Sequence, residues 1–288
     1  MSRPMLYSLA VPFALVALTA LGAFAYRGAI TRTFLYHPTH DDAGALATGG
    51  WQAVTLQNDG EILQGLVHPS TDPDGPWLVY FGGNAMPLGS LQGLSERVAT
   101  GAGWGAALFA YRGYDGSTGV PGQDGILSDA AAVPEFLERR FGVAPSRLVI
   151  LGQSLGSGVA AHVAAALGRA GTPPRGTALI SPYVSMDRVF NDHVPVIPIR
   201  WLVSDPYPTD VIAGDIPGPV LIVHGDRDPV IDVDHGRRLT KLLGGRATYH
   251  ELPGVGHNDI WGDPRLDGWI RHLAQTGDPK APPAVIPR

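Results

Sequence analysis

The sequence predicts an α/β fold in which a mostly parallel central sheet carries helices on both faces. Short apolar runs rich in β-forming residues alternate with helix-length segments, and they lie at residues 77–81, 106–111, 148–151, 177–180 and 220–223. Such continuous apolar strands are typical of parallel sheets, because helices cover both of their faces. Once the apolar N-terminus is set aside, about 250 residues remain, ample for one domain with a sizeable core. We assign this domain to residues 31–275.

The first two strands are expected to differ from the others. Residues 53–57 and 62–68 are joined by the turn-forming sequence Asn58-Asp59-Gly60-Glu61. So short a connection favours an antiparallel hairpin. We place this hairpin at the edge of the sheet.

The pentapeptide Gly-Gln-Ser-Leu-Gly at residues 152–156 joins the apolar run 148–151 to a small-residue, helix-like stretch at 157–167. A G-x-S-x-G sequence between a strand and a helix is typical of a nucleophile elbow. Its glycines are needed because a side chain two residues from the serine would collide with the neighbouring strand or helix. This geometry exposes the hydroxyl of Ser154 and places the N–H of Leu155 at a helix N-terminus, where it can stabilise an oxyanion. A glycine-rich turn with an N-capping serine is the structural alternative.

A serine nucleophile needs a base and a carboxylate that orients the base, and in this type of fold the chain order is Ser, Asp, His. Asp228 lies in the loop after the strand-like run 218–225, and His257 lies in the loop after 247–252. Both loops are expected at the carboxyl edge of a parallel sheet, where sites in such folds gather. Asp226 is the rival carboxylate. We favour Asp228, which lies deeper in the loop, and expect Asp226 to brace the turn.

The chain has ten histidines, and His257 stands apart because it lies in a glycine-flanked loop after the last predicted strand. His224 ends a strand and is expected to pack in the core. His193 falls in the proline-rich insert at about 182–215 and is a candidate for substrate contact.

Taken together, these motifs resemble the α/β-hydrolase superfamily, and in particular its membrane-anchored Bem-type serine hydrolases, which include protein depalmitoylases and lysophospholipid and monoacylglycerol lipases. The matching segments are residues 35–39, 80–85, 111–117, 152–158, 181–183, 224–228 and 256–259. The resemblance implies a catalytic triad of Ser154, Asp228 and His257. It also implies that the backbone N–H of Asn84 completes the oxyanion hole with that of Leu155. The family usually has His-Gly-Asn in this loop, whereas this chain has Gly82 in place of the histidine.

The insert at about 182–215 is rich in proline and apolar residues of weak periodicity. We expect it to form a small cap over the active site, with a buried pair of connecting helices as the alternative. A cap of this composition favours an apolar acyl group over a sugar or a charged polymer. The candidate substrate contacts in it are Tyr183, Met186, Phe190, His193 and Trp201.

Residues 4–26 carry no charge. About 22 helical residues span about 33 Å, enough for a bilayer core of about 30 Å. Residues 1–30 are therefore expected to contain a single-pass transmembrane signal-anchor. The sequence Ala23-Phe24-Ala25 fits a cleavage site, so secretion after removal of a signal peptide is the alternative. A retained anchor and a cleaved signal peptide would both export the domain. The positive charges on the two sides of the segment nearly cancel, so they do not determine its orientation.

The remaining composition excludes several classes of function. The chain has no cysteine, hence no disulfide, thiolate nucleophile or cysteine-bound metal. Its net charge of −5 and lack of a basic run argue against nucleic acid as a partner. We see no P-loop, HExxH or dinucleotide-binding motif, so no metal or organic cofactor is expected. Residues 276–288, which are rich in proline, are expected to be a disordered tail.

The predicted function is that of a serine hydrolase, an esterase or lipase-like enzyme that cleaves carboxylic esters or thioesters of small acyl or lipid-like substrates through an acyl-enzyme. A peptidase or amidase would use the same triad. The alternative from another class of function is a membrane-tethered scaffold protein without catalytic activity. The sequence gives no indication of the oligomeric state.

Overall fold

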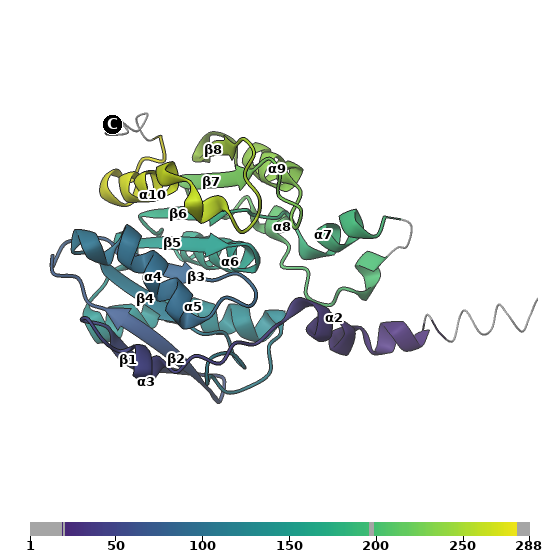
Figure 1. Ribbon diagram of the computed structural model, residues 1–288, viewed down its shortest axis with the longest axis horizontal. Helices are drawn as coiled ribbons and strands as arrows, with labels where there is room; N and C mark the ends of the chain where they lie inside the picture. The colour runs from purple at the N-terminus through teal and green to yellow at the C-terminus, as the bar shows by residue number, and fades with distance from the viewer. Residues whose placement is uncertain (1–18, 20, 196–198, 281–288) are drawn as a thin grey trace, which may run out of the picture.

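Eight strands form a single sheet in the computed structural model, which describes residues 19, 21–195 and 199–280 (Figure 1). Their order across the sheet is β1-β2-β4-β3-β5-β6-β7-β8. The strands are β1 Gln52–Asn58, β2 Glu61–His68, β3 Trp77–Phe81, β4 Gly105–Phe109, β5 Leu148–Gln153, β6 Gly176–Ile180, β7 Val220–Gly225 and β8 Ala247–Leu252. β1 and β2 pair as an antiparallel hairpin at one edge, and the six strands from β4 to β8 run parallel. The prediction of a mostly parallel sheet with an edge hairpin is confirmed.

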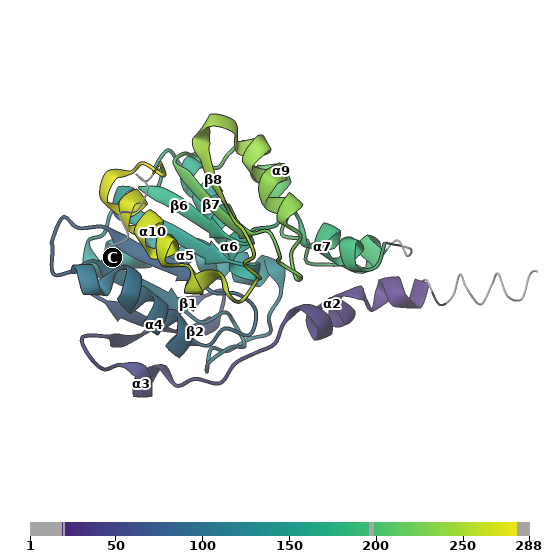
Figure 2. The same cartoon turned by 45° about the horizontal axis from the view of Figure 1, so that its top comes forward.

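Helices cover both faces of this sheet, as the sequence predicted (Figures 1 and 2). α4 packs against α10, while α5, α6, α8 and α9 contact one another in succession. The helices are α2 Arg27–Leu35, α3 Ala43–Leu46, α4 Leu88–Val98, α5 Gln123–Phe141, α6 Leu155–Arg169, α7 Met186–His193, α8 Thr209–Ile212, α9 Val233–Leu243 and α10 Pro264–Thr276. Five short 3₁₀ turns complete the described elements: η1 Thr100–Ala102, η2 Pro145–Arg147, η3 Ile199–Leu202, η4 Gly244–Arg246 and η5 Ile260–Gly262.

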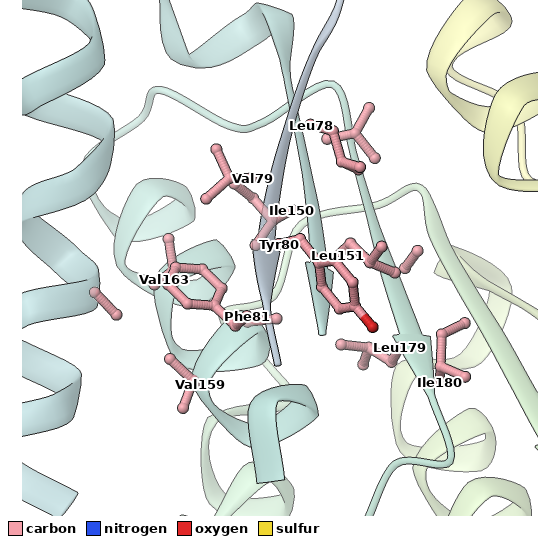
Figure 3. Close-up of a cluster of buried hydrophobic side chains, with 14 of the residues drawn as sticks. Leu78, Val79, Tyr80, Phe81, Ile150, Leu151, Val159, Val163, Leu179 and Ile180 are labelled. Atoms are coloured by element: carbon pink, nitrogen blue, oxygen red, sulfur yellow. The ribbon is translucent and has the colours of Figure 1, made fainter. Parts of the chain in front are cut away.

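The hydrophobic core lies on both sides of the central strands, whose residues are buried along their whole length. Figure 3 shows Val79 and Phe81 of β3 on the side of Val159 in α6, whereas Tyr80 points to the opposite face. This alternation explains why the strand sequences are apolar without a break, since both faces of each strand must be covered. The centre of the sheet, buried on both faces, supports the loop that follows β5.

The insert between β6 and β7 holds α7, η3 and α8. α8 packs on the body of the domain, whereas α7 projects from it beside α2 (Figures 1 and 2). α7 and η3 contact each other, and η3 also contacts α2. The N-terminal helix and the insert, which are far apart in the sequence, thus form one layer.

No helix among residues 19, 21–195 and 199–280 has the length and apolar character needed to cross a bilayer. Most of the expected span at 4–26 lies outside these residues. The same is true of the end of the expected tail, from 281 to 288, while its first residue, Thr276, closes α10.

Candidate active site

Ser154 lies in a strained turn between β5 and α6, with φ 52° and ψ −122°. A residue with a side chain is rarely found at a positive φ unless the surrounding structure holds it there. A Cβ at Gly152 would lie 2.2 Å from the carbonyl oxygen of Gly156, and a Cβ at Gly156 would lie 2.1 Å from that of Phe81. Both distances are far below contact, so the two glycines are needed for the steric reason that the motif suggested.

The structure brings Ser154, His257 and Asp228 together in one hydrogen-bonded chain. Nε2 of His257 lies 2.9 Å from Oγ of Ser154, and its Nδ1 lies 2.6 Å from Oδ2 of Asp228. Asp228 follows β7 and His257 follows β8, and these strands are parallel neighbours. The carboxylate is fully buried and the imidazole nearly so.

The buried carboxylate of Asp228 has more partners than His257 alone. Its Oδ1 accepts hydrogen bonds from the N–H groups of Val230 and Ile231, at 2.9 and 2.8 Å. Burial raises the pKa of Asp228, but hydrogen bonds from His224, His257 and Ile231 outweigh this effect and hold the pKa well below its usual range. Asp228 is therefore a carboxylate at neutral pH.

Two backbone N–H groups adjoin the serine. One belongs to Leu155, the first residue of α6, and the other to Asn84, in the loop after β3. Within the described ranges, neither donates to a protein acceptor. The loop packs closely on the elbow, because a Cβ at Gly83 would lie 3.4 Å from Cβ of Ser154. Oδ1 of Asn84 accepts from the hydroxyl of Tyr114 at 3.0 Å, which fixes the side chain.

The same loop is held in place without the histidine that the family usually carries. The carbonyl of Gly82 accepts a hydrogen bond from the hydroxyl of Tyr111 at 2.8 Å. A Cβ at Gly82 would lie 2.9 Å from the side chain of Leu91. A larger residue here would thus require Leu91 to move.

The rival residues have structural roles. Oδ1 of Asp226 accepts from the N–H of Gly254 at 2.6 Å, so Asp226 braces the two loops as expected. His224 is fully buried, as the sequence indicated, but it also approaches Asp228. Among the described residues, no group of three or more histidine or acidic side chains is arranged to hold a metal ion.

A cavity of about 210 Å³ borders Ser154. Its walls are formed by Phe34, Leu35, Asn84, Ser154, Leu155, Met186, Val189, Phe190, His193, Val230 and Ile231. Three of the candidate substrate contacts therefore line it: Met186, Phe190 and His193.

The other two candidates, Tyr183 and Trp201, do not line this cavity. Tyr183 is fully buried, and its hydroxyl donates to the carbonyl of Leu155 at 3.1 Å, so it supports the elbow from below. Trp201 is 65% exposed. Val230 and Ile231 also line the cavity and were not predicted, although they follow Asp228 closely. The same is true of Phe34 and Leu35 of α2.

Comparison with known proteins agrees with this fold. A family model of the α/β-hydrolase fold matches residues 125–197. An uncharacterized Mycobacterium tuberculosis protein, MT2364, is 32% identical over 270 residues, which cover 91% of this chain and 94% of that protein. The lysophosphatidylserine lipase ABHD12 of Rattus norvegicus is 28% identical over 229 residues, 71% of this chain and 57% of the lipase. The crystal structure of an α/β-hydrolase from Vibrio vulnificus matches with a TM-score of 0.66 at 22% identity, over 81% of this chain and 83% of that one. With its sheet order, its strained serine and these relatives, the chain belongs to the α/β-hydrolase superfamily.

Proposed function

We propose that this protein is a serine hydrolase that cleaves carboxylic esters or thioesters of acyl or lipid-like substrates. The observation that carries the proposal is the hydrogen-bonded chain from Ser154 through His257 to Asp228, at the edge of a largely apolar cavity. The name of the relative ABHD12, a lysophosphatidylserine lipase, supports an ester-linked lipid as the class of substrate.

In the proposed mechanism, Nε2 of His257 takes the proton of Ser154 while Oγ attacks the carbonyl carbon of the substrate. Asp228 keeps the proton of the imidazole on Nδ1 and stabilises the imidazolium that forms. The N–H groups of Leu155 and Asn84 donate to the oxyanion of the tetrahedral intermediate. The imidazolium then protonates the leaving alcohol or thiol as its bond to the carbonyl carbon breaks.

The second half of the cycle repeats these roles with water. His257 removes a proton from a water molecule, and the resulting hydroxide attacks the acyl group on Ser154. The bond to Oγ breaks, Ser154 regains its proton from the imidazolium, and the carboxylic acid leaves. One water molecule is consumed in each cycle: its oxygen enters the carboxylic acid, and its protons balance those given to the leaving group and to the acid.

The test is labelling of the full chain with a fluorophosphonate, beside turnover of p-nitrophenyl esters. Wild type should be labelled, Ser154→Ala should not, and the variant should lose on the order of 10⁴ or more in turnover. Ser90→Ala, on the exposed side of α4, is the matched control and should behave as wild type. A Ser154→Ala protein that keeps near wild-type esterase activity would overturn the proposal.

We also propose that the N-terminal segment anchors the domain to a membrane from its exported side. The absence of charge from residue 4 to residue 26 supports this. So does the exposure of Leu21 and Phe24 on the described part of the segment. Membrane fractionation and sequencing of the mature N-terminus test it: a soluble protein that begins after Ala25 would show a cleaved signal peptide instead.

A further inference from the structure

A second cavity, of about 270 Å³, lies between α2 and the insert. Ile30, Thr31 and Phe34 of α2 form one wall, and Phe190, Val194 and Leu202 of the insert form part of the other. The insert therefore does more than cover Ser154, because it encloses additional space against the N-terminal helix.

The two cavities adjoin. Phe34 and Phe190 belong to the walls of both, whereas Ser154 borders the first alone. The second cavity thus adjoins the first at Phe34 and Phe190. A linear ligand whose reactive end lies at Ser154 would extend into it.

The chemistry of the second cavity suits a hydrocarbon. Thr31 is the polar residue among those named above, and its hydroxyl is already satisfied: it donates to the carbonyl of Leu202 at 3.1 Å and accepts from the N–H of Ser204 at 3.0 Å. A polar headgroup would find no free partner among these side chains and would lose its hydration. The same two hydrogen bonds hold α2 against the insert, so both walls are fixed in place.

We propose that the second cavity binds the distal part of a long acyl chain whose carbonyl carbon lies at Ser154. This inference rests on the proposed esterase function and names its substrate as a long-chain acyl ester. It makes α2 a wall of the binding site. Phe34, which is 67% exposed, stands where the cavity meets the surface, beside the segment expected to enter the membrane.

The experiment is a chain-length series of p-nitrophenyl esters, from butyrate through octanoate to dodecanoate, with the full chain in lipid nanodiscs. The readout is the ratio of kcat/KM for dodecanoate to kcat/KM for butyrate. In wild type, kcat/KM should rise by up to about fourfold for each added methylene that becomes buried. Ile30→Trp and Leu202→Trp fill the second cavity and should lower the ratio tenfold or more.

Ala29→Trp is the matched control, because Ala29 is the neighbour of Ile30 on α2 and its side chain is exposed. It should leave the ratio as in wild type. Fluorophosphonate labelling of each variant shows whether the elbow is intact. If a tryptophan variant fails to fold, Leu202→Ala enlarges the cavity and should shift the preferred chain length upward.

The outcomes separate the two proposals. If wild type is not labelled and hydrolyses none of the esters, the proposed function is wrong. A wild type that hydrolyses butyrate but shows no gain with chain length overturns the acyl-chain assignment and leaves the esterase intact. The same conclusion follows if both tryptophan variants keep the wild-type ratio, or if they lose butyrate and dodecanoate turnover equally.

Discussion

Nε2 of His224 lies 3.4 Å from Oδ2 of Asp228, the same oxygen that His257 approaches at 2.6 Å. The His224 ring is fully buried, and its Nε2 also lies 2.9 Å from the carbonyl oxygen of Ile231. The geometry requires a proton on Nε2, since a carbonyl can only accept. This proton is shared between the carbonyl of Ile231 and the carboxylate of Asp228. In the proposed mechanism, His224 is therefore a positioning residue for that carboxylate.

Replacement of His224 by phenylalanine removes this donor from a buried carboxylate. A hydrogen bond to a charged group contributes about 1.5–3 kcal/mol, and this long one should lie at the lower limit, so we expect kcat to fall about tenfold. KM for a short ester should not change, because His224 does not line the cavity at Ser154. Steady-state kinetics measure the split. His224→Gln, which keeps an N–H donor, should recover part of kcat, and an equal loss in both variants would argue for a purely structural role.

Ser154→Gly should stabilise the fold while it abolishes turnover. A non-glycine residue held at positive φ costs about 1–3 kcal/mol of strain, which glycine does not carry. The greater freedom of glycine in the unfolded chain offsets part of this gain. We therefore expect the free energy of unfolding to rise by about 1 kcal/mol. Denaturant titration measures it, with Ser154→Ala beside it, which keeps the strain and should unfold as wild type does. Equal stability of all three proteins would show that the turn carries no strain.

Gly156→Ala should destabilise the domain severely, because the new Cβ would lie 2.1 Å from the carbonyl oxygen of Phe81 in β3. Overpacking against backbone costs about 1–3 kcal/mol or more, and activity should fall with it. Gly268→Ala in α10 is the matched control, since a Cβ there meets nothing within 4 Å. In a helix interior that change should instead stabilise by about 0.5–1 kcal/mol. Opposite signs in thermal unfolding are the expected result.

Three histidines make the fold sensitive to mild acid: His235 is buried, and His162 and His250 are partly buried. Burial lowers the pKa of His162, His235 and His250 below the ordinary value, and it outweighs the favourable hydrogen bonds that His162 makes to Gly158 and His235 to Asp192. Unfolded histidines titrate near about 6.5. As the pH falls below about 6.5, the unfolded chain therefore binds more protons than the folded one, and the free energy of unfolding decreases until the lower folded-state pKa values are passed.

Thermal unfolding at about pH 7.5 and about pH 5.5 measures this loss, with Tm falling by about 2–4 °C for each kcal/mol. His250 stacks on Trp269 at a ring distance of 4.0 Å, so His250→Phe keeps an aromatic ring there and removes one titrating group. The variant should show a smaller drop in Tm between the two pH values than wild type does. An equal drop would assign the acid sensitivity to the other groups.

The sheet and the hydrogen-bonded Ser154–His257–Asp228 chain were predictable because each depends on a local pattern. Apolar runs mark buried strands, and the carboxyl ends of parallel strands meet at one edge, so Asp228 and His257 were expected near each other before any distance was known. The glycines at 152 and 156 likewise encode a steric demand within five residues of chain.

The walls of the cavities were not predictable in this way. Phe34 and Phe190 are far apart in the sequence, and no periodicity in either segment indicates that they would border the same space. Tyr183 shows the converse. It lies in an apolar insert beside true wall residues, yet it is buried because Gly158 leaves room for it: a Cβ there would lie 2.2 Å from the tyrosine oxygen. A side chain whose position depends on residues far away in the sequence is not identified by any pattern in the sequence around it.

The order of the strands also has a consequence for how activity is lost. Ser154 follows β5 in the middle of the sheet, whereas His257 follows β8, the last strand, which is only partly buried along most of its length. Local unfolding begins at such margins, at a lower free energy than global unfolding. Fraying of β8 would carry His257 away while Ser154 and most of the secondary structure stay in place. On gradual heating, the proposed hydrolysis should therefore be lost while the circular dichroism spectrum is still that of the native protein.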